Sequence, residues 1–369
     1  MSLALTIYPR LILDALTTVR YPGNGKNIVE NGMVSEDIKI EDLKVSFSIT
    51  FPKNPDPFSR SVVKAAEAAV HSFASTEAEV MIEVKYKNDT AQAQADEQPP
   101  VNARHIIAVA SGKGGVGKST VAANLAIAMA RMGHRVGLLD TDIFGPSMPK
   151  MFQVEDQRPG AIEVDGENGE KRTLICPIEQ YGVKLLSIGF FIDPDQPTLW
   201  RGAMACNALK QLIQDSDWGD LDYFILDTPP GTSDIHLSLL SILKLSGAVI
   251  VSTPQQVALA DARKGINMYK NEKVNVPILG LVENMAWFTP RELPDNRYYI
   301  FGREGCKQLA EQLNVPLLAQ IPLVQGICED SDAGIPPALR PQTPEGNAFM
   351  TLAARVVTAT DRMQSESEE

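Results

Sequence analysis

The feature that most constrains this chain is the run Gly112-Lys113-Gly114-Gly115-Val116-Gly117-Lys118-Ser119, which fits the pattern G-x-x-x-x-G-K-[ST]. An apolar segment, residues 105–110, precedes it, and a segment with helical periodicity, residues 118–133, follows it. Glycines let successive N–H groups point into one concavity that wraps phosphate oxygens, and the helix N-terminus adds positive charge. We expect the Lys118 ammonium to contact the β- and γ-phosphates and the Ser119 hydroxyl to bind Mg²⁺.

Apolar runs alternate with helical stretches throughout this part of the chain. The apolar runs are residues 105–110, 135–140, 222–227, 247–253 and 277–285. They are continuously apolar, as strands covered on both faces are. The pattern predicts an α/β fold, with the phosphate loop on a parallel sheet wrapped by helices.

The first part of the chain has a different pattern. Residues 44–51 and 79–86 alternate as half-buried strands do, and residues 59–75 carry apolar side chains on one helical face. With a first helix near residues 8–20, residues 1–87 are predicted to form a small α+β domain.

Composition sets the other boundaries. Residues 88–103 are rich in Ala, Gln, Asp and Pro and are predicted to be a linker. The phosphate-loop domain is predicted to span residues 104–361, and residues 362–369 to form an acidic tail.

Charge and cysteine usage exclude several classes. The 34 basic and 46 acidic side chains give a net charge of −12, which disfavours binding to nucleic acid or to an anionic membrane. No apolar run approaches the length of a membrane span, and Pro9, Arg10 and Asp14 interrupt the first apolar stretch, so no secretory signal is expected. The four cysteines are widely spaced and form no CxxC pair, which fits reduced thiols in an intracellular protein. We therefore expect a cytoplasmic protein.

Two further segments carry carboxylates after apolar runs. Asp227 ends one run, where a phosphate-loop protein needs a carboxylate to hold the hydration shell of Mg²⁺, and the N–H of Gly231 could reach the γ-phosphate. Asp142, in the sequence Asp140-Thr141-Asp142, could orient a water molecule for attack on the γ-phosphorus. Capping of the following helix is the alternative for each carboxylate.

Four segments together resemble a known family. SGKGGVGKST, with its second lysine Lys113, resembles the deviant phosphate loop of the dimerising MinD/ParA class of ATPases. In combination with DTDIFGPSMPKMF, LDTPPGTSD and VENMAWF, it resembles the Mrp-type iron–sulfur cluster carrier ATPases. Residues 1–87 are similar to the small domain of cytosolic iron–sulfur assembly factors, so the resemblance covers nearly the whole chain.

The resemblance implies a role for particular residues. Lys113 would reach the nucleotide of the partner subunit in a homodimer, and Asn284 would hydrogen-bond adenine. Ser119, Asp142 and Asp227 would hold Mg²⁺, partly through water. The catalytic residues would be Lys113, Lys118, Asp142 and Asp227. The residues expected to contact ATP are Gly112, Lys113, Gly114, Gly115, Val116, Gly117, Lys118, Ser119, Thr120, Gly231 and Asn284.

Each of two implied roles has an alternative that the residues leave open. Lys118 already occupies the phosphate cradle, so Lys113 has no task within its own loop and fits a role across the interface better than exposure to solvent. The alternative is an exposed lysine without such a role. Asn284 follows an apolar run, where its amide could pair with adenine. It could also simply form a turn.

The chain departs from the resemblance in its cysteines. Many relatives carry a CxxC pair shortly after the segment that corresponds to residues 282–288, but here no cysteine follows until Cys306. Thr50-Phe51-Pro52 stands where relatives of the small domain often carry a cysteine. Cysteine thiolates hold iron–sulfur clusters, so the ligands of a cluster are not identified.

Cys306 lies at the start of a predicted helix, a position that lowers a thiol pKa. We expect any cluster to be labile or to be completed by other groups. We also expect Cys306→Ser to affect it more than Cys176→Ser or Cys328→Ser.

The leading hypothesis is a homodimeric Mg·ATP-dependent ATPase that receives iron–sulfur clusters from a scaffold and passes them to apoproteins. Residues 142–150 and 227–234 would act as its nucleotide switches. Two alternatives remain open: an adaptor that kept the switch and lost the cluster, and a positioning ATPase. The acidic composition and the mixed C-terminal segment argue against a positioning ATPase.

Overall fold

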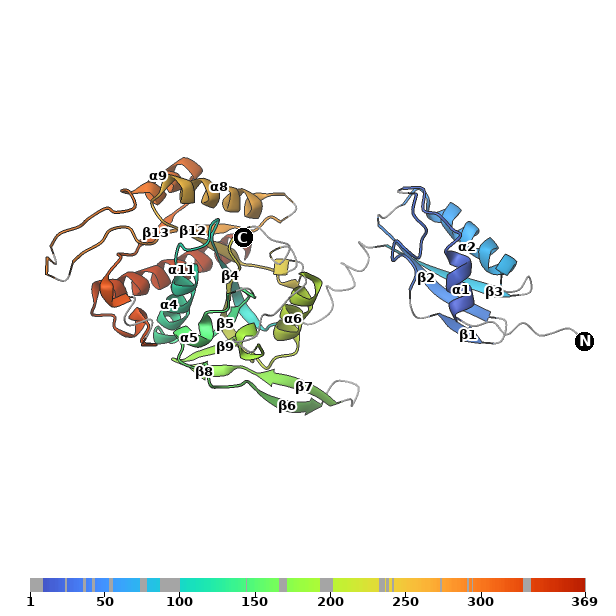
Figure 1. The fold of residues 1–369 in the computed structure, drawn as a ribbon, viewed down its shortest axis with the longest axis horizontal. Coiled ribbons are helices and arrows are strands. Elements are labelled where there is room, and N and C mark those ends of the chain that lie inside the picture. The colour runs from blue at the N-terminus through green and yellow to red at the C-terminus, as the bar shows by residue number, and fades with distance from the viewer. Residues whose placement is uncertain are drawn as a thin grey trace, which may run out of the picture. The chain divides into compact units, whose positions relative to one another are not determined.

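The computed structural model divides the chain into two compact units, residues 1–98 and 99–369 (Figure 1). The structure describes residues 9–86 and 100–368. Within those ranges it leaves out residues 24, 36–37, 42–43, 53–55, 74–77, 144, 166–170, 193–201, 232–235, 237–238, 241, 273, 291, 294 and 328–332. Residues 88–99 of the expected linker therefore lie outside the described residues.

The first unit is a three-stranded sheet with two helices. Its elements are α1 (Pro9–Leu16), β1 (Lys39–Glu41), β2 (Lys44–Phe51), α2 (Ser59–Phe73) and β3 (Glu79–Tyr86). The strand order is β1-β2-β3, antiparallel between the first pair and parallel between the second. One apolar core joins both helices to the sheet, with Ile12, Phe47 and Val62 among its buried side chains. This is the small α+β domain that the sequence predicts.

The second unit is built on an eight-stranded sheet in the order β13-β12-β11-β4-β10-β5-β9-β8. All neighbouring strands are parallel except β8 and β9. The strands are β4 (Ala103–Ala110), β5 (Val136–Asp140), β8 (Ile178–Gln180), β9 (Val183–Ser187), β10 (Leu221–Asp227), β11 (Gly247–Ser252), β12 (Ile278–Glu283) and β13 (Leu317–Gln320). The predicted parallel sheet is confirmed.

Helices cover both faces of this sheet (Figure 1). They are α4 (Lys118–Arg131), α5 (Met148–Met151), α6 (Gly202–Gln214), α8 (Gln256–Lys270), α9 (Gly305–Leu313) and α11 (Pro344–Glu368). One core cluster joins α4, α5 and α11 to the sheet, and a second joins α6, α8 and α9. Alternate residues of β4 enter the two clusters, Ile107 the first and Ile106 the second. The strand is therefore covered on both faces, as its unbroken apolar run predicts.

Short elements were not predicted from the sequence. The edge strands β8 and β13 and the neighbouring strand β9 lie outside the apolar runs used for the prediction. So does the antiparallel hairpin of β6 (Gly160–Asp165) and β7 (Lys171–Cys176). Two 3-10 turns, Ile188–Phe190 and Pro337–Leu339, complete the described elements.

The ends of the second unit differ from the expected boundaries. Residues 100–103 belong to this unit, since Val101 is buried and β4 begins at Ala103. At the other end, α11 continues to Glu368, through the segment expected to be an acidic tail. Within the described residues, none of the helices combines the length and the apolar character that a membrane crossing requires.

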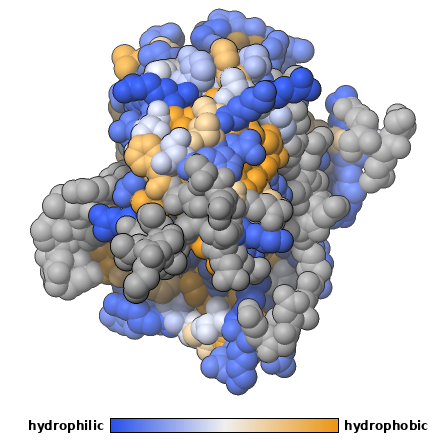
Figure 2. All heavy atoms as spheres, turned by 90° about the vertical axis from the view of Figure 1, so that its right-hand side faces the viewer, coloured by the Kyte–Doolittle hydropathy of each residue, from blue (hydrophilic) through white to orange (hydrophobic). Residues whose placement is uncertain are grey.

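The surface mixes charged and apolar side chains. On the face drawn in Figure 2, hydrophobic residues interrupt a largely hydrophilic surface. Large apolar side chains that are more than half exposed in the second unit include Phe191, Met204, Val257 and Ile300.

Candidate functional site

The phosphate loop connects β4 to α4 at the carboxyl edge of the sheet. Gly115 and Gly117 have φ angles of 80° and 81°, in the left-handed region that glycine adopts without strain. At Gly112 a Cβ atom would lie 2.2 Å from the backbone carbonyl carbon of Asp261, so no side chain fits there. The order of strand, glycine loop and helix is the one that the sequence predicts.

Lys118 and Asp227 form a buried ion pair under this loop. The Lys118 Nζ lies 2.5 Å from the Asp227 Oδ1 and donates to the Ser119 Oγ at 3.2 Å. Lys118 is 6% exposed and Asp227 is fully buried. Burial raises the pKa of Asp227, and the Lys118 charge opposes that shift. The Asp227 Oδ2 is buried without a hydrogen bond to any described residue, so it can accept a further ligand.

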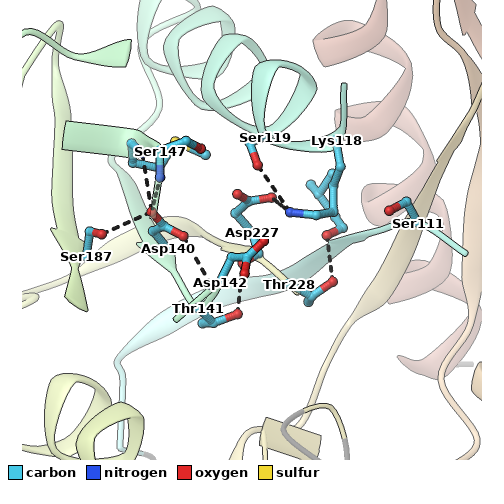
Figure 3. Close-up of polar contacts among 12 residues, drawn as sticks. Ser111, Lys118, Ser119, Asp140, Thr141, Asp142, Ser147, Ser187, Asp227 and Thr228 are labelled. Atoms are coloured by element: carbon cyan, nitrogen blue, oxygen red, sulfur yellow. Dashed lines mark hydrogen bonds and ion pairs between the residues drawn. The ribbon is translucent and has the colours of Figure 1, made fainter. Parts of the chain in front are cut away.

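Asp140 is the most densely bonded carboxylate of the site (Figure 3). Its Oδ1 accepts the Asp142 N–H at 3.1 Å, and its Oδ2 accepts the Ser147 and Met148 N–H groups at 3.2 and 3.3 Å. The Ser187 hydroxyl donates to the same Oδ2 at 3.0 Å. Burial and the nearby Asp227 charge raise the pKa of Asp140 to about 7. Sequence reasoning missed this residue as a site residue, although it begins the Asp-Thr-Asp motif.

Asp142 lies beside Asp227 at the open end of this network (Figure 3). Its side chain is half-buried, and its charge raises the pKa of Asp227. Thr141 joins the two segments, because its N–H and its hydroxyl both donate to the Asp227 carbonyl oxygen, at 3.0 and 2.8 Å. The structure thus brings Ser119, Lys118, Asp142 and Asp227 together.

Gly231 is engaged differently from the expectation. Its N–H donates to the Ser111 carbonyl oxygen at 3.0 Å, so a contact with the γ-phosphate would require this bond to open. Thr228 is fixed in the same way, with its N–H and hydroxyl on the Val109 carbonyl oxygen. The rest of the second expected switch, residues 232–234, lies outside the described residues.

Asn284 contacts the phosphate loop directly. Its Nδ2 donates to the Val116 carbonyl oxygen at 2.8 Å, and a Cβ atom at Gly117 would lie 2.2 Å from that nitrogen. The residue is 7% exposed. The resemblance assigns the Asn284 amide to adenine, but in the structure one of its N–H groups is bonded to the phosphate loop. Sequence spacing gave no indication of this contact.

Lys113 is the exposed cation of the loop. Its carbonyl oxygen accepts the Ser111 hydroxyl at 3.0 Å, and its ammonium makes no ion pair with any described residue. Its side chain is therefore available for a contact outside its own loop.

Cys306 contradicts the expectation of a lowered thiol pKa. The residue is fully buried, and burial together with the Glu283 carboxylate raises its pKa well above the usual range. Its N–H donates to the Glu283 Oε2 at 2.6 Å. The start of α9 faces the core, where Gly305 leaves no room for a Cβ atom against the Pro254 carbonyl oxygen. The expectation was wrong because a helix start lowers a thiol pKa only where solvent or a cation reaches the sulfur.

The described residues contain no group of three or more His, Cys, Asp or Glu arranged to hold a metal ion. Cys176 and Cys206 are half-buried and form no disulfide, and Cys328 lies outside the described residues. Residues 287–303 present aromatic and basic side chains instead of thiols. The Arg297 guanidinium lies 4.3 Å from the Trp287 ring centroid, and that of Arg303 lies 5.0 Å from the Tyr299 ring centroid.

A glycine loop and a buried lysine–carboxylate pair at the carboxyl edge of a parallel sheet define a P-loop nucleotide-binding protein. The profile of the family described as NUBPL iron-transfer P-loop NTPase, of the ParA group, matches residues 102–357. A second profile, described as iron-sulfur cluster assembly protein, matches residues 10–82. The chain belongs to the NUBPL-type family of iron-transfer P-loop NTPases, which confirms the resemblance stated from the sequence.

Relatives extend over most of the chain. It is 40% identical over 348 residues to an iron-sulfur cluster carrier protein of Synechocystis, covering 94% of this chain and 96% of the relative. It is 44% identical over 264 residues to the mouse iron-sulfur cluster transfer protein NUBPL, covering 71% and 79%. A solved nucleotide-binding protein of Archaeoglobus fulgidus in complex with ADP is similar with a TM-score of 0.55 and 32% identity, covering 71% of this chain and 96% of that one.

Proposed function

We propose that this protein is a homodimeric Mg·ATP-dependent ATPase that carries iron–sulfur clusters from a scaffold to apoproteins. The observation that carries the proposal is the buried Lys118–Asp227 pair beneath the glycine loop, with Ser119 and Asp142 beside it. The printed names of the relatives, iron-sulfur cluster carrier and transfer proteins, supply the cargo.

ATP would bind along the loop from Gly112 to Thr120. The backbone N–H groups would wrap the phosphates, and Lys118 would exchange its contact with Asp227 for the β- and γ-phosphate oxygens. The adenine would lie toward Asn284, whose side chain already touches the loop. The ADP complex of the Archaeoglobus relative supports a nucleotide in a fold of this kind.

The polar groups beside the loop fit Mg²⁺, which prefers oxygen ligands. The Ser119 hydroxyl, the unbonded Asp227 Oδ2 and the half-buried Asp142 carboxylate would hold it, partly through water. The bound ion would neutralise charge that develops on the phosphate oxygens during hydrolysis.

Asp142 would orient the attacking water. It is the carboxylate of the site that keeps partial exposure, whereas Asp140 is saturated by donors and Asp227 is occupied by Lys118. A general base of this kind contributes about 10²-fold or more to the rate. The first nucleotide switch would respond to a change at this site, because the N–H groups of Asp142, Ser147 and Met148 are all bonded to the Asp140 carboxylate.

The homodimer would place Lys113 of one subunit on the nucleotide of the other. Its exposed ammonium, without an ion pair among the described residues, supports that role. A second candidate function is the nucleotide-switched adaptor, because the described residues offer no thiolate set and bury Cys306. The positioning ATPase is not favoured, since α11 buries Phe349, Leu352 and Val356 in the core and is no free amphipathic helix.

The test is steady-state hydrolysis of ATP with Mg²⁺ by the full chain and by Asp142→Ala. We expect kcat to fall about 10²-fold and KM to change by less than about threefold, because water orientation is needed only for the chemical step. Asp156→Ala, which removes an exposed carboxylate of the following segment, is the matched control. Hydrolysis at the wild-type rate by Asp142→Ala would refute the assignment.

A further inference from the structure

Three polar residues lie side by side on neighbouring strands at the carboxyl edge of the sheet. The parallel register pairs Ser187 of β9 with Asp140 of β5, and Asp140 with Asp227 of β10. All three are completely buried. Two buried carboxylates on adjacent strands repel each other, and of the two it is Asp227 that Lys118 contacts. Asp140 therefore depends on other groups for its orientation.

Four groups donate to Asp140 among the described residues. Three are backbone N–H groups of Asp142, Ser147 and Met148, which lie in the segment that follows Asp140 at the end of β5. The fourth is the Ser187 hydroxyl, at 3.0 Å, and it alone is a side chain and comes from another strand. The Ser187 contact is thus the one that ties this carboxylate to a fixed part of the sheet.

Ser187 is itself held in place. Its Oγ accepts the Gly189 N–H at 3.0 Å, which starts the 3-10 turn Ile188–Phe190, and Phe190 is buried. Gly189 packs against the segment that follows β5, since a Cβ atom at Gly189 would lie 3.0 Å from the Pro146 side chain. The hydroxyl therefore has a defined direction when it donates to Asp140.

The consequence is a division of roles between two aspartates (Figure 3). The Asp140 Oδ2 is turned toward Ser187 and Ser147, and Lys118 contacts Asp227 instead of Asp140. Its Oδ1 holds the Asp142 N–H at 3.1 Å, and this leaves the Asp142 carboxylate beside Asp227.

We propose that Ser187 is a positioning residue for ATP hydrolysis. Its hydroxyl holds Asp140, and Asp140 holds the backbone of Asp142 so that the Asp142 carboxylate stays beside the phosphate loop. The inference rests on the proposed function, because it assigns Ser187 a part in the step that Asp142 performs. It predicts an effect on the chemical step and none on nucleotide affinity, since Ser187 makes no contact with the glycine loop.

The test compares Ser187→Ala with Ser216→Ala. Ser216 is also buried, and its hydroxyl has no hydrogen-bond partner among the described residues, so its removal controls for loss of a buried hydroxyl. We expect Ser187→Ala to lower kcat about tenfold with KM unchanged, because a hydrogen bond to a charged group is lost. Ser216→Ala should retain the wild-type kcat.

A double-mutant cycle distinguishes positioning from a general structural effect. If Ser187 acts through Asp142, then Ser187→Ala should not slow single-turnover hydrolysis of radiolabelled ATP any further in an Asp142→Ala background. Additive losses, or an unchanged kcat in Ser187→Ala, would overturn this inference while leaving the proposed function intact. A wild-type protein that does not hydrolyse ATP would overturn both.

Discussion

The phosphate loop and residues 287–303 both follow strands that end at the same edge of the sheet. They differ in whether the chain itself provides the side chains that their expected ligands need. At the phosphate loop, Lys118, Ser119 and Asp227 are already in mutual contact, and they need only a nucleotide and a metal ion. Residues 287–303 carry no cysteine, and the thiol that follows them, Cys306, is buried.

This difference indicates that nucleotide binding and cluster binding place different demands on the chain. Nucleotide chemistry requires groups at fixed positions in one loop and two strand ends, and the structure places Lys118, Ser119, Asp142 and Asp227 at such positions. Cluster binding requires thiolates that solvent and iron can reach, and these can come from a partner protein. The part of the chain that the structure describes thus brings nucleotide-binding groups together, whereas it contains no cluster of thiols that could hold iron.

The change with the largest expected effect is Lys118→Ala. It removes the cation from the phosphate cradle and leaves Asp227 buried without its partner. We expect Mg·ATP affinity to fall by at least about 100-fold and the free energy of unfolding to fall by about 3 kcal/mol. Calorimetric titration and thermal unfolding measure the two effects.

Lys210→Ala, which removes an exposed lysine of α6, is the matched control and should change neither quantity. Wild-type affinity in Lys118→Ala would show that the loop does not hold the phosphates.

The second change examines the exposed lysine. If Lys113 acts across the dimer, mixing a Lys113→Ala subunit with a Lys118→Ala subunit should restore one active site in each heterodimer. In that site Lys118 is intact in one subunit and Lys113 in the other. Neither homodimer should hydrolyse ATP, and the mixture should approach about half of the wild-type rate per heterodimer.

Heterodimers must be demonstrated by co-purification of differently tagged subunits. A mixture that contains them and remains as inactive as its parents would exclude the role of Lys113 across the interface.

The smallest effect is expected at the opposite ends of the same strands. Arg135 precedes β5 and donates to the Asp222 carboxylate of β10, with its Nη2 at 2.9 Å. These hydrogen bonds lower the pKa of Asp222 from 3.8 to about 2. A lowered pKa contributes stability above pH 3.8, and this contribution disappears as pH falls toward 2.

Asp222→Asn should therefore lower Tm by about 2 °C at pH 7 and by less at pH 3, with kcat unchanged. Thermal unfolding across this pH range measures the effect. A change in kcat would mean that the amino ends of these strands are coupled to the site.

The sequence predicted the parts of the site that one short segment contains. The glycine loop, Lys118 and Ser119 are contiguous, and Asp227 follows an apolar run that could only be a buried strand. The α/β sheet was predictable for the same reason, because its central strands are unbroken apolar runs.

The contacts between distant segments could not be predicted. Ser187 and Asp140 are 47 positions apart and meet only through the register of β5 and β9. Asn284 reaches Val116 across 168 positions. Sequence spacing also does not say which way a helix start faces, and Cys306 was misread on that account.

The described residues assemble the nucleotide site but no set of thiols, so we expect the chain to bind ATP and any cluster on it to be labile. The most direct test is the iron retained by the anaerobically reconstituted protein after a chelator challenge, with ATP binding verified in the same sample. We expect the iron to be lost while about one ATP per subunit remains bound. Because Cys306 is buried, we now expect Cys306→Ser to lose iron at the same rate, in place of the larger effect expected from the sequence. A cluster that survives the chelator in the wild type would show that this chain holds it firmly with its own residues.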